Sequence, residues 1–279
     1  MMLTPEESIR FQNEIGADII MQLDDVVSST NLSDERFREA TLRSVRWLDR
    51  CIEAHARPHD QSLFAIIQGG LDVSPGGLRD LCLTEMVARE LPGYAIGGLA
   101  GGEDKDSFWQ VVDFCTARLP KEKARYLMGV GYPLDLVVSV ALGVDMFDCV
   151  YPTRTARFGT ALVPGGTLRL KAKECAEALQ PVDEECRCQC CRGYTRAHLH
   201  VLFKENNPLA CQLLTMHNVA YMLRLMRSMR EAILGGDDAF GAFVNSFLER
   251  QFPAGDVPTW VRDALGKAGV ILRQSSVSG

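Results

Sequence analysis

The feature that most constrains the fold is a strand–helix unit that recurs five times in the first 150 residues. Its strands are short apolar segments that end in glycines or acids: Asp18–Leu23, Ser62–Ile67, Gly93–Ile96, Ala124–Met128 and Asp145–Val150. Helix-forming stretches separate them, around residues 33–56, 74–90, 104–118 and 133–142. Apolar strands without polar alternation, joined through helices, indicate a parallel sheet that is buried on both faces.

Two architectures can contain such units. An open doubly wound sheet needs no closure, whereas a closed (β/α)8 barrel needs eight strands. No strand here opens on G-x-G-x-x-G, and polar groups gather at the carboxyl ends of the predicted strands. We therefore predict an α/β fold: a (β/α)8 TIM barrel lacking its first three strands, followed by a helical subdomain. The predicted domains are residues 1–160 (partial barrel), 161–252 (helical subdomain) and 253–279 (C-terminal extension and tail).

Caps and periodicity predict the helices. Thr4-Pro5-Glu6-Glu7 is a capping box with proline at the first helical position, and Gly16 ends that helix. The helix at 33–56 is predicted to bury a face made of Phe37, Leu42, Val45, Leu48 and Ile52. The longest helix, at 209–234, is predicted to pack through Leu213, Met216, Val219, Ala220, Leu223, Met226 and Met229. The polar tail at 273–279 is expected to fray.

The charge balance argues against a general affinity for nucleic acid. The 279 residues carry 30 Lys and Arg against 36 Asp and Glu, a net charge of −6, so RNA or DNA contact needs a local basic patch. The interval 153–196 supplies one, with Arg154, Arg157, Arg169, Lys171, Lys173, Arg187, Arg192 and Arg196. No apolar run approaches the roughly 18 residues of a membrane helix, and we expect no signal peptide.

The cysteines fall into two groups. Those that are scattered singly are expected to be buried thiols of a reducing compartment: Cys51, Cys82, Cys115, Cys149, Cys175 and Cys211. The others crowd into Cys186-x-Cys188-x-x-Cys191, with Cys190 as a surplus thiol, and His217 lies farther along the chain. A Cys3His set suits tetrahedral Zn²⁺, and four protein ligands leave no open position, so we predict a structural zinc. Spacing alone leaves His198 and His200 open as the fourth ligand.

Acids recur at or near the predicted strand ends, namely Asp24, Asp25, Glu103, Asp145 and Asp148. A barrel would bring several of them to one rim, where carboxylates can act on a sugar anomeric carbon as nucleophile and proton carrier. A single aspartate can also bind the two adjacent donors of a purine amidine edge, and Gln68 with Gly69 and Gly97-Gly98 could complete that pocket.

The stretch from Val144 to Arg157 combines two of these signals. Its strand carries two acids and breaks at Pro152 into a predicted loop with Arg154 and Arg157. A strand that ends in carboxylates and leads into a basic loop is typical of a barrel active site for an anionic substrate. Spacing does not choose between Asp145 and Asp148.

The chain resembles the tRNA-guanine transglycosylases, the base-exchange enzymes of queuosine biosynthesis, from Leu3 to about Phe252. The Cys-x-Cys-x-x-Cys…His set belongs to this resemblance. The other motifs that carry it are Gln22-Leu23-Asp24-Asp25, Ile67-Gln68-Gly69, Tyr94-Ala95-Ile96-Gly97-Gly98-Leu99-Ala100, Tyr126-Leu127-Met128-Gly129-Val130-Gly131, Val144-Asp145-Met146-Phe147-Asp148-Cys149 and Pro152-Thr153-Arg154.

The resemblance implies a role for each matched residue. Asp145 would be the nucleophile that attacks C1′ of the wobble nucleotide and holds a covalent RNA intermediate. The base would be bound by Asp24, Gln68, Gly98, Leu99 and Met128, with Glu103 orienting the Leu99–Ala100 peptide. RNA would contact Gly129, Val130, Gly131, Tyr132, Pro133, Leu134 and Asp135, and Arg154, Thr155, Ala156, Arg157 and Phe158. Zinc would be held by Cys186, Cys188, Cys191 and His217.

Two positions narrow the resemblance to the eukaryotic branch. Gly101 and Val26 stand where bacterial members tend to carry valine and cysteine, and both changes are typical of enzymes that accept the larger base queuine. The resemblance then implies a catalytic subunit that pairs with a homologous non-catalytic subunit. It would act on the wobble guanine of GUN-anticodon tRNAs, in the cytoplasm or at the mitochondrial outer surface.

One family feature has no match in this sequence. Family members carry a Ser-Gly-Gly-Phe-Gln segment preceded by the aspartate that acts as general acid/base. We therefore expect an N-terminally truncated chain that is inactive alone, because general acid/base catalysis typically contributes about 10²–10⁴-fold. The alternative is a non-catalytic scaffold or RNA-contacting isoform that acts through the zinc-pinned helical region. A generic zinc-ribbon RNA binder would leave the strand-end acids unexplained.

Overall fold

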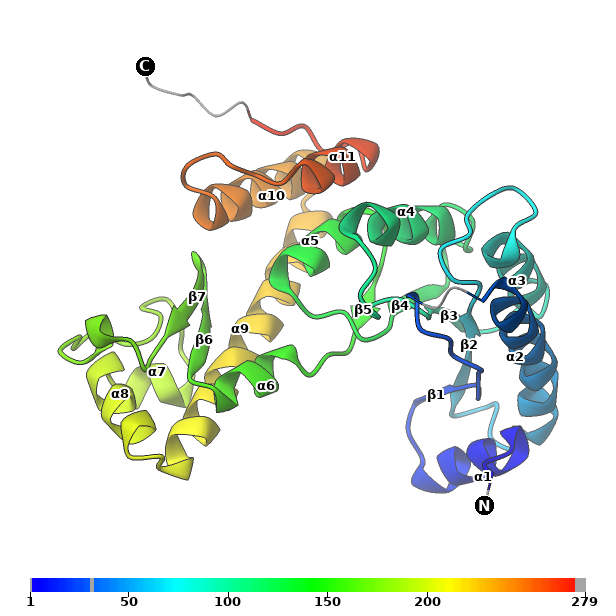
Figure 1. Ribbon diagram of the computed structural model, residues 1–279, viewed down its shortest axis with the longest axis horizontal. Coiled ribbons are helices and arrows are strands. Elements are labelled where there is room, and N and C mark those ends of the chain that lie inside the picture. The colour runs from blue at the N-terminus through cyan, green and yellow to red at the C-terminus, as the bar shows by residue number, and fades with distance from the viewer. Residues whose placement is uncertain (1, 31–32, 274–279) are drawn as a thin grey trace. The chain divides into compact units, whose positions relative to one another are not determined.

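The computed structural model describes residues 2–30 and 33–273, and it divides the chain into two compact units (Figure 1). Unit 1 comprises Met1–Val130 and Val138–Asp148, and unit 2 comprises Gly131–Val137 and Cys149–Gly279. The domain boundaries predicted at residues 160 and 252 are not tested by this division and stay predictions. Residues 274–279, part of the tail predicted to fray, lie outside the described residues.

The described part of unit 1 is an α/β half-barrel of five parallel strands in the order β1-β2-β3-β4-β5. The first helix, α1, and the helix α2 pack against each other, and α2 and α3 pack along β2 (Figure 1). The fold class predicted from the sequence is confirmed. The elements up to β5 are α1 (Pro5–Ile15), β1 (Ile19–Met21), α2 (Asp34–Ala54), β2 (Ser62–Ile67), α3 (Leu78–Val87), β3 (Gly93–Ile96), α4 (Lys105–Thr116), β4 (Ala124–Leu127), α5 (Pro133–Ala141) and β5 (Met146–Phe147).

The predicted capping box begins α1. The Glu7 amide donates to Thr4 Oγ1 at 3.3 Å and the Thr4 amide donates to Glu7 Oε2 at 3.1 Å, so two free amide donors of the first turn are satisfied. Gly16 ends the helix with φ of 79°, a left-handed conformation that glycine adopts without steric cost.

The buried face of α2 differs from the predicted one. Ile52 is 37% exposed, and Phe37 and Leu42 are only half-buried. The buried positions are Ala40, Thr41, Ser44, Val45, Leu48 and Cys51. The hydroxyls of Thr41 and Ser44 can face the core because they donate to helix carbonyls, Thr41 Oγ1 to Phe37 O at 2.7 Å and Ser44 Oγ to Ala40 O at 2.9 Å.

The part of unit 2 that follows β5 starts with two elements that the sequence did not predict. The segment after Val150 forms a helix instead of the predicted loop, because Pro152 lies in its first turn, where the missing N–H of proline is not needed. The turn-rich Pro164-Gly165-Gly166 stretch closes an antiparallel hairpin. The elements after β5 are α6 (Tyr151–Arg157), β6 (Thr160–Val163), β7 (Gly166–Arg169), a 3-10 turn (Lys173–Cys175), α7 (Gln189–Gly193), α8 (Arg196–Lys204), α9 (Pro208–Leu234), α10 (Asp237–Gln251) and α11 (Thr259–Lys267).

The predicted packing stripe of α9 is only partly correct. Leu213 and Met229 are buried as expected, but Met216 is 43% and Leu223 is 62% exposed. The helix buries a neighbouring face that includes two polar side chains, and its members are Ala210, Leu213, Leu214, His217, Asn218, Tyr221, Met222, Leu225 and Met229. Within the described residues, no helix is both long and apolar enough to cross a membrane.

Candidate functional site

The carboxyl edge of the sheet gathers most of the predicted site residues of unit 1. Ile67, Ile96 and Leu127 pair in register across β2, β3 and β4, and Leu127 pairs with Phe147 of β5. These four residues end their strands. The residues that follow them directly therefore share one edge, and they are Gln68, Gly97, Met128 and Asp148.

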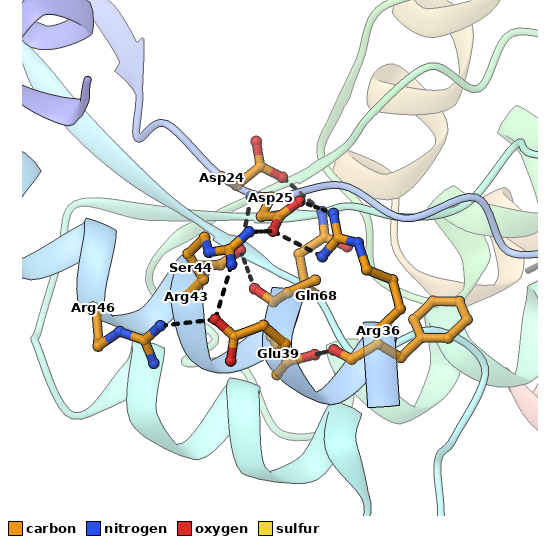
Figure 2. Close-up of polar contacts among 11 residues, drawn as sticks. Asp24, Asp25, Arg36, Glu39, Arg43, Ser44, Arg46 and Gln68 are labelled. Carbon is orange, nitrogen blue, oxygen red and sulfur yellow. Dashed lines mark hydrogen bonds and ion pairs between the residues drawn. The ribbon is translucent and has the colours of Figure 1, made fainter. Parts of the chain in front are cut away.

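Asp24 and Gln68 form the first polar pair of this edge (Figure 2). Asp24 lies three residues beyond β1, and its Oδ2 accepts a hydrogen bond from Gln68 Nε2 at 2.6 Å. Burial raises the pKa of Asp24 above its ordinary value, although the hydrogen bond from Gln68 opposes that rise. A half-buried carboxylate of this kind can accept hydrogen bonds from a polar ligand at little further desolvation cost.

Asp25 has a different environment from its neighbour. Its carboxylate is clamped by Arg36, whose Nη2 lies 2.5 Å from Oδ1, and by Arg43, whose Nη1 lies 2.7 Å from Oδ2 (Figure 2). The Asp25 amide also donates to Ser44 Oγ at 2.9 Å. The hydrogen bond from Arg36, with the charge of both arginines, lowers the pKa of Asp25. Asp25 therefore ties the loop to α2 and leaves Asp24 as the acid at the edge.

Two glycines leave room for the side chain of Gln68. A Cβ at Gly97 would lie 2.8 Å from Gln68 Nε2, and one at Gly98 would lie 2.6 Å from Gln68 Oε1. Gly98 also has a φ of 72°, which disfavours any side chain. The side-chain amide of Gln68 can occupy its observed position only because Gly97 and Gly98 lack side chains.

Glu103 organises the loop after β3. Its Oε1 accepts from the Ala100 amide at 2.7 Å, and its Oε2 accepts from the Gly101 amide at 3.0 Å and from Ser29 Oγ at 2.6 Å. Burial alone would raise the pKa of Glu103, but these hydrogen bonds lower it overall. The bond to Ala100 fixes the N–H of the Leu99–Ala100 peptide, which agrees with the orienting role that the resemblance implies. That role remains a prediction.

The structure places Asp145 and Asp148 at opposite ends of β5. Asp145 precedes the strand, and its Oδ2 accepts from the Arg125 amide at 2.8 Å, near the amino end of β4. Asp148 follows the strand, and its Oδ1 accepts from Tyr126 Oη at 2.6 Å and from the Gly129 amide at 2.8 Å. Only Asp148 shares the carboxyl edge with Gln68 and Met128. The sequence-based expectation that Asp145 also lies at that edge is therefore not met.

The cysteine cluster of unit 2 has the geometry of a metal site. Among the described residues, Cys186, Cys188, Cys191 and His217 place their ligand atoms within 4.8 Å of one another. The Sγ atoms of Cys188 and Cys191 lie 3.7 and 3.2 Å from His217 Nδ1. A tetrahedral ion with Zn–S near 2.3 Å would separate its ligands by about 3.5–3.8 Å, so the donor set fits Zn²⁺.

A second contact fixes the histidine for this role. His217 is fully buried, and its Nε2 lies 2.9 Å from the carbonyl of Leu162 in β6, which leaves Nδ1 to face the thiols. Burial lowers the pKa of His217, which keeps the imidazole neutral as a ligand must be. The competing His200 instead contacts Leu170 O at 2.8 Å, and His198 packs on Tyr194. The predicted ligand set is thus confirmed over its alternatives.

All ten cysteines lie in the described part of the chain, and none of them forms a disulfide. The scattered ones at 51, 82, 115 and 175 are buried as predicted, whereas Cys149 and Cys211 are only half-buried. Cys190 is buried but lies outside the ligand set.

The predicted RNA-contacting residues of α6 and of its C-cap include exposed basic and aromatic side chains. Arg154, Arg157 and Phe158 are exposed, Phe158 to 71%, while Ala156 is buried. Exposed guanidinium groups suit a phosphate backbone, and an exposed ring suits an unstacked base. The predicted RNA-contacting residues 129–135 form a loop only up to Tyr132, because α5 begins at Pro133. Tyr132 is 56% exposed and packs on Tyr151 with ring centroids 4.4 Å apart, whereas the side chains of Val130 and Asp135 are buried.

Comparison with known proteins decides the family. Residues 1–253 match the family described as queuine tRNA-ribosyltransferase. The queuine tRNA-ribosyltransferase catalytic subunit of Schizosaccharomyces pombe is 51% identical over 98% of this chain and 68% of its own length. The chain belongs to the queuine tRNA-ribosyltransferase family. The Caenorhabditis elegans catalytic subunit is 46% identical over 98% of this chain and 70% of its own length. The queuine tRNA-ribosyltransferase of Thermus thermophilus is 46% identical over 96% of this chain and 67% of its own length.

Membership in the queuine tRNA-ribosyltransferase family confirms the predicted enzyme class, because tRNA-guanine transglycosylases are pentosyltransferases. It also agrees with a structural zinc in the Cys3His cluster. The chain spans about two thirds of the length of these relatives.

Two structural side chains of this family member were missed by the sequence reasoning. Asn218 is fully buried on α9, accepts from the Leu162 amide at 2.9 Å, and donates to Pro152 O at 2.9 Å and Thr160 O at 3.0 Å. It thereby ties α6 and β6 to the helix that carries His217. The other is Arg79. The helical spacing of the sequence places it on the same face of α3 as the buried residues Cys82, Leu83 and Met86, and a charged residue on an apolar face could have been noticed there.

Proposed function

We propose that this chain carries the base pocket and the nucleophile of a queuine tRNA-ribosyltransferase catalytic subunit. It would exchange the wobble guanine of GUN-anticodon tRNAs for queuine through a covalent Asp–RNA intermediate. The observation that carries the proposal is the shared carboxyl edge, where Asp24, Gln68, Met128 and Asp148 follow neighbouring strands. Family membership supports the same chemistry.

Base recognition in this proposal uses the Asp24–Gln68 pair. The Asp24 carboxylate would accept from the two adjacent donors of the guanine amidine edge, and Met128 would stack on the ring. Gln68 and the backbone of Gly98 and Leu99 would supply the remaining polar contacts. Glu103 supports this arrangement, because its bond to the Ala100 amide holds the Leu99–Ala100 peptide in one orientation.

The nucleophile in this proposal is Asp148, a revision of the Asp145 assignment implied by the resemblance. Both bonds to Asp148 use Oδ1, so Oδ2 is not committed to either of them. An attack by Asp148 on C1′ would form an ester bond as the C1′–N9 bond breaks, and guanine would leave with the electron pair. The incoming base would reverse this step through its own N9. The resemblance assigns the proton transfers to an aspartate outside the matched motifs.

The RNA contacts are proposed for the exposed face of α6 and for the loop before α5. Arg154 and Arg157 would bind phosphates around the wobble position, and Phe158 would stack on an unpaired base. The relatives from fission yeast and nematode are named catalytic subunits, which supports a partner subunit. We propose a homologous non-catalytic subunit as that partner, and a cytoplasmic or mitochondrial-surface location for the pair.

The test of base recognition replaces Asp24 with Asn. We expect the KM for guanine to rise about 100-fold or more, because each hydrogen bond to a charged group contributes roughly 1.5–3 kcal/mol. The assay uses a full-length form, in which the parts of the S. pombe relative outside the matched 282 residues are joined to this chain. Asp18→Asn, an exposed aspartate before the same strand, is the matched control and should leave KM unchanged. An unchanged KM in Asp24→Asn would contradict this assignment.

The pH dependence of base binding follows from the raised pKa of Asp24. Binding needs the carboxylate, which is present above the folded-state pKa and is lost as pH falls through it. We therefore expect the KM for guanine to rise on acidification at a higher pH than an ordinary aspartate would give. Because the ionised form opposes folding above that pKa, Asp24→Asn should also keep or raise the melting temperature at neutral pH. A KM that is flat over this range would contradict the role of Asp24.

Specificity for queuine is proposed to depend on Gly101. A Cβ there would lie 2.6 Å from Ser29 Oγ, so a valine would displace the segment that Glu103 holds. We expect Gly101→Val to raise the KM for queuine by about 10-fold or more, in line with the effect of a few carbon atoms in a closed pocket. The KM for guanine, the smaller base, should change by less than about threefold, and equal effects on both bases would contradict the proposal.

A further inference from the structure

Arg79 is an unusual side chain for the interior of this protein. It is 0% exposed and lies on α3 among the buried residues Cys82, Leu83 and Met86. Burial lowers the pKa of its guanidinium below the ordinary value, so its surroundings must offset a substantial desolvation cost. An apolar residue at this position would avoid that cost, which indicates that the guanidinium has a specific task.

Within the described part of the chain, its hydrogen bonds go to backbone carbonyls. Nη1 donates to Ile67 O and to Gly97 O, both at 2.9 Å, and Nε donates to Gly70 O at 3.1 Å. Nη2 also donates to Gly70 O. One planar group thus joins the carboxyl ends of β2 and β3 to the loop that follows β2.

These three carbonyls bracket the residues proposed to bind the base. Ile67 and Gly70 flank Gln68-Gly69, and Gly97 precedes Gly98. A second residue of α3 also holds this loop, because the backbone amide of Gln68 donates to Cys82 Sγ at 3.2 Å. The loop also packs directly on the start of α3, since a Cβ at Gly69 would lie 2.5 Å from the Arg79 amide nitrogen.

We propose that Arg79 is the positioning residue of the base pocket, which it sets by holding the Gln68-Gly69-Gly70 loop against the Gly97-Gly98 segment. This inference rests on the proposed function of Gln68 and Gly98. The task requires arginine, because its flat fork directs donors to several fixed acceptors at once, whereas a lysine ammonium is a single point of attachment. Arg79 touches neither base nor RNA in this proposal and acts through the two segments.

The test compares Arg79→Lys with Arg125→Lys in the full-length form. Arg125 is the matched control: it is 8% exposed and donates to Gly143 O at 3.2 Å and Leu119 O at 2.8 Å, but it belongs to the amino end of β4. For Arg79→Lys we expect the KM for guanine to rise on the order of 10–100-fold, because misplacing binding groups is costly, while kcat at saturating base changes by less than about threefold. Arg125→Lys should lower the melting temperature similarly and leave KM within about twofold.

A second variant separates an effect on the base pocket from loss of the fold. Arg79→Met removes the donors, leaves an unbranched apolar side chain and relieves the desolvation cost of the buried charge. It should fold and still show the raised KM. Hydrogen–deuterium exchange of the 279-residue chain gives a readout without activity, and residues 67–70 and 97–101 should exchange faster in both Arg79 variants than in Arg125→Lys.

The outcomes separate this inference from the proposed function. A KM in the Arg79 variants equal to that of Arg125→Lys, or unchanged amide exchange in the two segments, would overturn the role of Arg79. A failure of the proposed function has a different signature, because the unsubstituted full-length form would then incorporate no base at all. In that case, amide exchange would still decide whether Arg79 holds the two segments together.

Discussion

Replacing Asp148 with Asn should abolish the covalent adduct between the full-length form and tRNA, whereas Asp145→Asn should leave it intact. Asp148 follows β5 at the carboxyl edge, and an amide cannot form the ester with C1′, so base exchange should fall by about 10³-fold or more. Asp145 accepts a hydrogen bond from the Arg125 amide, and the Asn side-chain oxygen can keep that bond. Exchange by Asp145→Asn should therefore stay within about threefold of the unsubstituted rate.

The adduct can be followed on a denaturing gel with labelled tRNA, and thermal melting of both variants serves as the folding control. Loss of the adduct in Asp145→Asn together with its persistence in Asp148→Asn would return the nucleophile to the residue that the resemblance implied. Loss in both variants with unchanged melting would show that each carboxylate is needed, and the assignment by strand position would then be insufficient.

Removing the zinc should unfold the region around α7, β6 and α9. The cluster joins Cys186, Cys188 and Cys191 to His217 on α9, and His217 is anchored in turn to Leu162 of β6. Apparent binding energies of structural zinc are about 10–16 kcal/mol in zinc-finger peptides, as large as the whole stability of a typical domain, about 5–15 kcal/mol. Cys191→Ser or a strong chelator should therefore lower the melting temperature by tens of degrees and reduce helix content.

Metal analysis should find one zinc per chain in the unsubstituted protein and much less in Cys191→Ser. Cys190→Ser is the matched control, since Cys190 is a buried thiol of the same segment that lies outside the ligand set. It should keep the zinc and lose only the packing energy of one thiol. Complete loss of zinc without a change in melting would contradict a structural role for the metal.

The regular part of the fold could be predicted because it depends on local patterns. The strands at 62–67 and 93–96 were predicted to the residue, since apolar runs that end at glycine or a polar residue need no knowledge of their partners. The Cys3His set was predictable for a similar reason, because metal-ligand spacing is a property of the sequence.

The differences from the sequence-based expectations arise where strand pairing decides the outcome or where a local pattern allows a second arrangement. Spacing within the predicted strand Asp145–Val150 did not choose between Asp145 and Asp148, whereas pairing with β4 limits β5 to Met146–Phe147 and places the two acids at its opposite ends. The buried face of α2 was misplaced because Thr41 and Ser44 satisfy their hydroxyls within the helix and can then face the core. Pro152 was interpreted as the end of a strand leading into a loop, although it lies in the first turn of α6.

Incorporation of labelled base tests most directly whether the carboxyl edge of this sheet exchanges a base in tRNA. The full-length form, loaded with zinc, is incubated with a GUN-anticodon tRNA and labelled queuine or guanine, and the label is located by nuclease mapping. We expect label at the wobble position, none in a tRNA with another base there, and none with Asp148→Asn. A folded, zinc-loaded protein that incorporates no label, or that incorporates it equally in Asp148→Asn, would contradict base exchange at this edge.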